Sequence, residues 1–263
     1  MKTFLVRNRK KMLISFILAY VLLFIIVNKQ NQIFRYLYAE KVWVHRVNSI
    51  EKLTEVNALF KGVELDVMFL NAKGTFDVNH PPAKSIDLSL FTYLSSIEDP
   101  SLHHFWLDFK NLTPSNKESS YIRLDSILGV LNLKKQQFII ESRTPENLDV
   151  FINNGYKTSY YFPSRIYKLN AKELEEKVKA IKHKLTLNKT DYISANLDHY
   201  SIMKNRFSKQ KILTWPYKYE QESYYNPITL LKKLKNVYYK YKVLSNDKVH
   251  AVLFTYEAKK GNR

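Results

Sequence analysis

From residue 42 onward, short apolar runs alternate with longer segments of helical periodicity. The short runs are rich in Val, Ile, Phe and Tyr, which is typical of strands, and the longer ones repeat their apolar residues every three or four positions. Strands alternating with helices over about 220 residues predict a parallel sheet with helices outside it. The expected strands are 42–44, 63–70, 75–80, 105–109, 137–141, 158–162, 192–195, 212–215, 237–243 and 249–256, and the main expected helices are 49–60, 88–97, 121–131, 145–153, 171–185 and 227–234.

A doubly wound sheet and a (β/α)8 barrel both satisfy this alternation. No glycine-rich phosphate loop follows the first strand, which disfavours a nucleotide-binding doubly wound sheet. Polar residues stand at the ends of several different strands, and in barrels the active site gathers at the carboxyl ends of the strands. We therefore predict an α/β chain with an irregular (β/α)8 barrel of TIM type over residues 42–263.

The first forty residues predict a membrane anchor. A basic cluster precedes a mostly apolar run from Met12 to Val27, which is about sixteen residues long, close to the roughly 17–25 that cross a bilayer. No small-x-small cleavage site follows it, so an uncleaved signal anchor is expected rather than a removed signal peptide, and a buried core helix fits an all-round apolar run less well. Basic residues ahead of the run favour a cytoplasmic N-terminus and a barrel outside the cytoplasm. The expected segments are a cytoplasmic 1–11, a single-pass span 12–28, a tether 29–41 and the barrel 42–263.

The charge and cysteine content exclude several classes of site. The formal net charge is +18, which suits nucleic-acid or anionic-membrane binding. The lysines are dispersed and no nucleic-acid motif accompanies them, so a lysine-rich composition is the better interpretation and no nucleic-acid partner is expected. The absence of cysteine excludes disulfides, thiolate metal sites and cysteine nucleophiles.

Carboxylates and a lysine follow the strand alternation on two neighbouring parallel strands. Glu64 and Asp66 lie two residues apart, so both point to one face of their strand, and Asp108 and Lys110 repeat this spacing on the next. Carboxylates directed into a barrel are costly unless positive charge lies between them. Three of them suit a hard divalent cation, Mg²⁺ or Ca²⁺, with Lys110 adding charge for an anionic substrate. A structural lysine–carboxylate cluster is the alternative, and spacing alone does not decide between the two.

Two histidines accompany these carboxylates. His45 ends the first strand, and a hairpin around the turn 71–74 would return His80 to the strand that carries Glu64. Two imidazoles beside a metal-bound anion can serve as general base and general acid. The other histidines have no such setting and are expected to be surface or packing residues: His103, His104, His183, His199 and His250.

The order His45-Arg46, Glu64-x-Asp66, His80, Asp108-x-Lys110 resembles the phospholipase-C-like phosphodiesterase superfamily. That superfamily includes the glycerophosphodiester phosphodiesterases and the sphingomyelinase D toxins. The sequence segments 44–49, 79–82 and 106–111 are more similar still to the menorin group of this superfamily. The resemblance covers residues 42–165 best.

The resemblance implies a distorted (β/α)8 barrel that uses a divalent cation. It implies that His45 and His80 are the catalytic acid and base, and that Lys110 holds the phosphate with support from Arg46. In the mechanism typical of such enzymes, a neighbouring substrate hydroxyl attacks phosphorus to give a cyclic phosphate while the histidines move the protons. The metal ligands implied are Glu64, Asp66 and Asp108.

Two positions depart from the glycerophosphodiesterase pattern, and two further residues are weaker pocket candidates. Val47 stands where those enzymes usually have Gly, and Pro81 where they usually have Asp. Glu141, with Arg143, ends a later strand and would line the pocket unless the pair is a surface ion pair. Trp215 ends another strand, where related enzymes often carry a pocket tryptophan, and packing is its alternative role.

The sequence as a whole predicts a membrane-anchored, metal-dependent phosphoric diester hydrolase. Its substrate would be a lipid-derived or polyol phosphodiester outside the cytoplasm. The alternative is a catalytically idle barrel that acts as a membrane-anchored binding protein.

Overall fold

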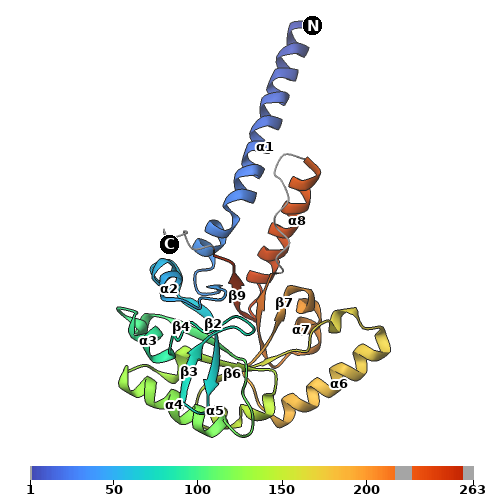
Figure 1. The fold of residues 1–263 in the computed structure, drawn as a ribbon. Helices are drawn as coiled ribbons and strands as arrows, with labels where there is room; N and C mark the ends of the chain where they lie inside the picture. Colours follow the sequence, from blue (N-terminus) through green and yellow to red (C-terminus); the bar gives the residue numbers. More distant parts are fainter. Residues whose placement is uncertain (1, 217–226, 257–263) are drawn as a thin grey trace. The chain divides into compact units, whose positions relative to one another are not determined.

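The computed structural model describes residues 2–216 and 227–256 (Figure 1). These residues form two units. One is a barrel that contains residues 39–216 and the last strand, and the other is a helical unit that contains helices α1 and α8. Each unit is described separately below.

The barrel is a closed ring of parallel strands. The sheet has nine strands, ordered β1-β9-β8-β7-β6-β5-β4-β2-β3, and a further pairing of β1 with β2, at Val44 and Val63, closes the ring. Strand β3 is the exception, since it lies antiparallel on β2 as the return arm of a hairpin. The (β/α)8 barrel and the hairpin expected from the sequence are both confirmed. The strands are β1 (Val42–Val44), β2 (Gly62–Leu70), β3 (Thr75–Val78), β4 (His104–Phe109), β5 (Phe138–Ser142), β6 (Lys157–Tyr161), β7 (Tyr192–Asn196), β8 (Lys211–Trp215) and β9 (Val249–Phe254).

Helices connect successive strands, and local sequence signals set several of their starts. Ser49 caps the first of them by accepting a hydrogen bond from the Lys52 amide at 3.2 Å. Asn170 and Glu173 form a capping box at the start of the longest helix of the barrel. The helices of the barrel are α2 (Ile50–Asn57), α3 (Leu90–Ser95), α4 (Lys117–Val130), α5 (Asp149–Asn153), α6 (Ala171–Leu187) and α7 (Tyr200–Arg206), with 3₁₀ turns at Pro100–Leu102, Lys135–Gln137, Pro145–Asn147, Ile166–Lys168 and Leu197–His199.

Strand alternation divides the core into two parts. Val63, Leu65 and Val67 on β2 are buried in the large cluster that also contains residues of the covering helices. The intervening side chains point into the barrel, where a second cluster fills the interior. The interior cluster consists of Trp43, Trp106, Ile139, Tyr192, Leu213, Ala251 and Leu253, with Trp215 packed against it.

The structure corrects the secondary structure expected near the end of the chain. Residues 237–243, expected as a strand, belong to helix α8 (Pro227–Leu244). Their Tyr and Val content favours strands, but Leu230, Lys233, Lys240 and Leu244 recur at helical spacing and are buried. Helix α8 makes its main contacts with helix α1 (Lys2–Leu37), and this tertiary packing overrides the local preference.

Helix α1 is longer than the sequence suggested. The segment 29–41, expected to be a tether, is helical as far as Leu37. The stretch Lys11–Leu37 is long and apolar enough to cross a membrane, with a mean hydropathy of 2.3 in its most apolar window, of which only 6% is buried.

Candidate active site

The carboxyl ends of the barrel strands surround a cavity of about 140 Å³. Every site residue expected from the sequence lines this one cavity, although those residues come from β2, β4, β5 and β8 and from the segments that follow β1, β3 and β4. The side chains that line it are His45, Arg46, Glu64, Asp66, His80, Trp106, Asp108, Lys110, Glu141, Arg143, Tyr161, Trp215 and Leu253.

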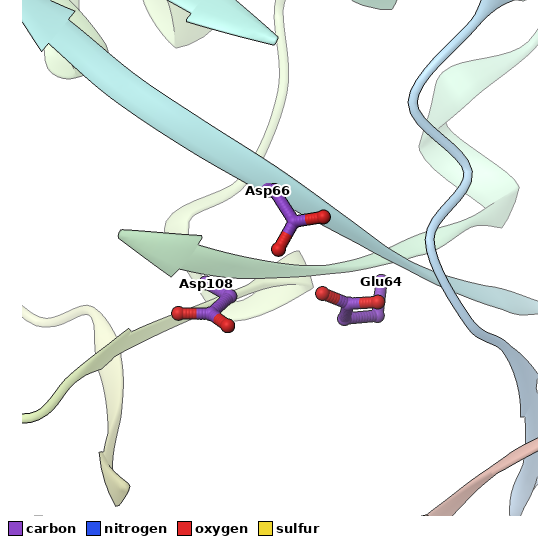
Figure 2. Close-up of side chains that lie close together, drawn as sticks. All are labelled: Glu64, Asp66 and Asp108. Carbon is purple, nitrogen blue, oxygen red and sulfur yellow. The ribbon is translucent and has the colours of Figure 1, made fainter. Parts of the chain in front are cut away.

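Three carboxylates converge at this cavity (Figure 2). Strands β2 and β4 pair Asp66 directly with Asp108, and Glu64 lies two residues earlier on the same face of β2. Each of the three residues offers one oxygen, and these oxygens lie within 4.8 Å of one another. Burial, and next the charge of Asp66, raises the pKa of Glu64 well above its usual range. Nearby positive charge would therefore stabilise the ionised form of these carboxylates.

Lys110 supplies part of that positive charge. Its Nζ lies 2.6 Å from Asp66 Oδ1 and donates a hydrogen bond to Asp108 Oδ2. Burial lowers the pKa of Lys110, but the two carboxylates outweigh it and hold that pKa above its ordinary value. The ammonium is thus charged at neutral pH.

The segment after β1 folds back over β2 and holds two of the carboxylates by hydrogen bonds. The Arg46 amide donates to Glu64 Oε2 at 2.7 Å, with Arg46 in the left-handed region at φ 54°. Asn48 donates through Nδ2 to Asp66 Oδ2 at 2.6 Å, and its Oδ1 accepts the Asp66 amide at 2.9 Å. Asn48 thereby fixes the orientation of the Asp66 carboxylate. This role is not visible in the sequence, because it depends on where the turn after β1 folds.

The two histidines reach the cavity by different routes. His45 follows β1 directly, its Nε2 lies 3.7 Å from Glu64 Oε2, and its ring stacks on that of Trp215 with 6.3 Å between centroids. Burial, and next the charge of Arg46, lowers the pKa of His45 to about 4. His80 follows the hairpin, and its Nε2 accepts a hydrogen bond from Arg46 Nη2 at 3.0 Å.

Aromatic rings and a further carboxylate complete the wall. Trp215 contacts Trp106 at 6.0 Å and Tyr161 at 5.3 Å between ring centroids, and the Arg143 guanidinium lies 4.3 Å from the centre of the Tyr161 ring. Glu141 is buried, and this burial raises its pKa well above the usual range. The sequence predicts Tyr161 only as part of a strand, and the one signal for its role is its place near the carboxyl end of that strand.

Comparison with known proteins finds solved structures with a similar fold, but no match by sequence among family models or curated proteins. A solved glycerophosphodiester phosphodiesterase of Parabacteroides distasonis is similar with a TM-score of 0.51 at 16% identity, over 82% of this chain and 92% of that one. This chain has the fold of the glycerophosphodiester phosphodiesterases.

Two further solved structures support the same conclusion. One is assigned to a glycerophosphoryl diester phosphodiesterase of Silicibacter pomeroyi, with a TM-score of 0.53 at 12% identity over 83% of this chain and 90% of that one. The other is a structure assigned to a glycerophosphoryl diester phosphodiesterase of Agrobacterium tumefaciens, with a TM-score of 0.54 at 14% identity over 82% of this chain and 92% of that one. The resemblance noted in the sequence motifs and the similarity of the barrel therefore point to the same group of folds.

Proposed function

We propose that this protein is a metal-dependent phosphoric diester hydrolase. The observation that carries the proposal is the gathering of two histidines, three carboxylates and a lysine around one cavity at the carboxyl ends of the barrel strands. A phosphodiesterase needs groups that move protons and groups that offset phosphoryl charge, and this cavity contains both.

A divalent cation fits the carboxylate cluster. Glu64, Asp66 and Asp108 offer oxygen ligands close together, and the raised pKa of Glu64 reports a deficit of positive charge there. Oxygen ligands of this type suit Mg²⁺ or Ca²⁺. When bound, such a cation offsets the negative charge on the phosphoryl oxygens.

The side chains of the cavity account for the proton transfers. One of His45 and His80 accepts the proton of a substrate hydroxyl next to the phosphodiester, and the hydroxyl oxygen forms a new bond to phosphorus. The bond from phosphorus to the leaving alcohol breaks, and the other histidine donates a proton to that alcohol, which leaves a cyclic phosphate. Water then attacks this phosphorus and gives a proton to one histidine, while the other histidine protonates the ring oxygen whose bond to phosphorus breaks, which yields the phosphate monoester. Lys110 and Arg46 hold the phosphoryl oxygens, and Glu141 and Trp215 shape the pocket for the rest of the substrate.

The helix α1 suits a single-pass anchor with the N-terminus in the cytoplasm and the barrel outside it. Its apolar stretch follows basic residues, the arrangement that favours this orientation. A barrel tethered to a bilayer has ready access to lipid-derived phosphodiesters, so we propose these, or polyol phosphodiesters, as the substrates.

Hydrolysis of glycerophosphodiesters, whose glycerol carries the neighbouring hydroxyl, with Mg²⁺ or Ca²⁺ and with chelator, tests the proposal. The wild type should be active only with a cation, and His45→Ala and Glu64→Ala should each lower kcat/KM by at least about a hundredfold. His183→Ala and Glu176→Ala, on the exposed face of α6, are the matched controls and should retain activity. Activity that survives chelation, or that both site variants retain, would contradict the proposal.

The Lys110 ion pairs favour a second candidate, a catalytically idle binding protein, because they satisfy two of the carboxylates without a metal. Such a protein would bind neither Mg²⁺ nor Ca²⁺ at this site, and it would hydrolyse none of these substrates. Calorimetric titration of the cations into wild type and Glu64→Ala separates the two candidates.

A further inference from the structure

The helical unit contains a second surface with a defined chemistry. Helices α1 and α8 pack side by side, with Lys240 Nζ donating to Gln30 Oε1 at 3.2 Å and a hydrogen bond of 2.7 Å between the hydroxyls of Tyr38 and Ser245. The partner of Tyr38 comes later in the chain than the partner of Gln30, so α1 and α8 run in the same direction. The level of any residue of α8 along α1 can therefore be estimated from the Lys240–Gln30 contact.

The side of α8 opposite α1 is basic and aromatic. Leu231, Lys235, Tyr238 and Lys242 are spaced four, three and four residues apart, so they form one stripe, and all are exposed. We call this stripe the α8 outer face. The Lys242 ammonium lies 5.4 Å from the centre of the Tyr238 ring. Helix α8 contains no Asp or Glu, and the exposed Lys232, Tyr239 and Tyr241 flank the stripe.

The parallel packing places this face at the end of the apolar part of α1. Counting from the Lys240–Gln30 contact, Tyr238 is level with Asn28, where the apolar run gives way to polar residues. Leu231, seven residues earlier, lies about 10 Å further along the apolar run. If α1 crosses a bilayer, Leu231 lies about 10 Å deep among the acyl chains and Tyr238 is at the level where the headgroups begin, where tyrosines concentrate.

We propose that the α8 outer face lies in the headgroup region of the bilayer that α1 spans and binds anionic phospholipid headgroups. The proposal goes beyond hydrolysis and rests on α1 being the membrane anchor. Charge complementarity favours anionic phospholipids as the partner, because the lysines attract anionic headgroups. The long lysine side chains can also reach from the apolar layer, where their backbone lies, to the headgroups. A protein partner fits less well, because lysine is depleted in protein–protein interfaces and Lys232, Lys235 and Lys242 lie on or beside this face.

Site-directed spin labelling measures this depth directly, because the chain has no native cysteine. The full chain is placed in nanodiscs of phosphatidylcholine and phosphatidylglycerol with one nitroxide, at Leu231→Cys, at Ile17→Cys in α1, or at Lys179→Cys on the exposed face of α6. Collisions of the nitroxide with a water-soluble nickel complex should be several-fold rarer at positions 231 and 17 than at position 179.

The outcomes separate the proposals. A protected position 17 with a position 231 as accessible as position 179 overturns the α8 proposal alone. An accessible position 17 overturns both the anchor and the α8 proposal. Phosphodiester hydrolysis by the same samples reports the barrel's activity independently of either result.

The role of charge is tested with matched lysine variants. Lys232→Gln, Lys235→Gln and Lys242→Gln are combined in one variant, and Lys172→Gln, Lys177→Gln and Lys179→Gln on α6 form a control with the same change in charge. Native mass spectrometry of protein released from mixed nanodiscs should show several-fold less retained phosphatidylglycerol for the α8 variant than for the wild type. Equal retention by the α8 variant and the control would overturn the proposal.

Discussion

At the scale of single residues, the site is held by a side chain whose role is not visible in the sequence. Glu64, Asp66, Asp108 and Lys110 could be predicted, because strand alternation alone puts residues two apart on one face. Asn48 could not, because its partner Asp66 becomes a neighbour only when the turn after β1 folds over β2. Spacing along a strand is encoded locally, whereas hydrogen bonds between distant segments are not.

Asn48→Ala should weaken divalent-cation binding. The change removes both hydrogen bonds that orient the Asp66 carboxylate, and loss of such supporting contacts typically lowers metal affinity about tenfold or more. Calorimetric titration of Mg²⁺ or Ca²⁺ measures the dissociation constant. The control is Asn205→Ala on the exposed side of α7, and equal affinities for the two variants would contradict the assigned role.

Lys110→Met should destabilise the cation-free protein and make its stability depend on added cation. Without the ammonium, Asp66 and Asp108 are left close together and largely buried, which should lower the free energy of unfolding by on the order of 2 kcal/mol. A divalent cation should restore more of this loss than it adds to the wild type. Urea denaturation with and without cation tests both points.

The control for Lys110→Met is Lys157→Met, which removes a more exposed ion pair with Asp191. Such pairs contribute little, so its free energy of unfolding should change by less than about 1 kcal/mol. If cation addition raises the stability of neither Lys110→Met nor the wild type, the carboxylates do not form a cation site.

At the scale of elements, the prediction succeeded where local chemistry decides and failed where packing decides. The β2–β3 hairpin follows from the turn residues 71–74, where Gly74 adopts a positive φ of 57°. The second half of α8 was wrongly expected to be a strand because Tyr and Val favour that state. Its burial against α1 depends on a segment about two hundred residues away, which no local pattern reveals.

Gly62→Ala should destabilise the start of β2. A Cβ at this position would lie 2.2 Å from the Trp43 ring, which is fully buried and cannot withdraw, so the free energy of unfolding should fall by roughly 1–3 kcal/mol. Gly129→Ala on α4 is the matched control, since its Cβ meets nothing within 4 Å. That change should raise stability by about 0.5–1 kcal/mol. Thermal and urea denaturation measure both, and equal effects of the two changes would contradict the close packing of Gly62.

At the scale of the whole molecule, the alternation of strands and helices was enough to predict the barrel. A parallel sheet needs crossover helices, and with polar residues at many strand ends the closed form was favoured. The grouping of α8 with α1 was not predictable, because the helix occupies the usual place of a barrel helix in the chain order. The order of elements therefore constrains the sheet more tightly than it constrains the helices between its strands.

His250 on β9 should contribute a loss of stability in mild acid, which is opposed by Glu64 and Glu141, because their raised pKa values let the folded barrel bind protons that the unfolded chain does not. This imidazole packs between Trp43 and Tyr192, and burial, and next the charge of Lys211, lowers its pKa to about 4. In the unfolded chain its pKa is near 6.5, so between these two values the unfolded state binds a proton that the folded state does not. The contribution of His250 to the free energy of unfolding thus falls as the pH drops below 6.5, by about 2 kcal/mol at pH 5.

His250→Gln should remove that share of the pH dependence. Urea denaturation at pH 7 and pH 5 should show that the change in the free energy of unfolding between the two pH values is less unfavourable for the variant than for the wild type, whatever the variant's stability at pH 7. His183→Gln on the exposed face of α6 is the control and should lose as much as the wild type. His45, whose pKa is also lowered to about 4, and the buried carboxylates are the same in both proteins, so their contributions cancel when the two proteins are compared. A variant that lost as much stability as the wild type would show that His250 is already protonated in the folded barrel at pH 5.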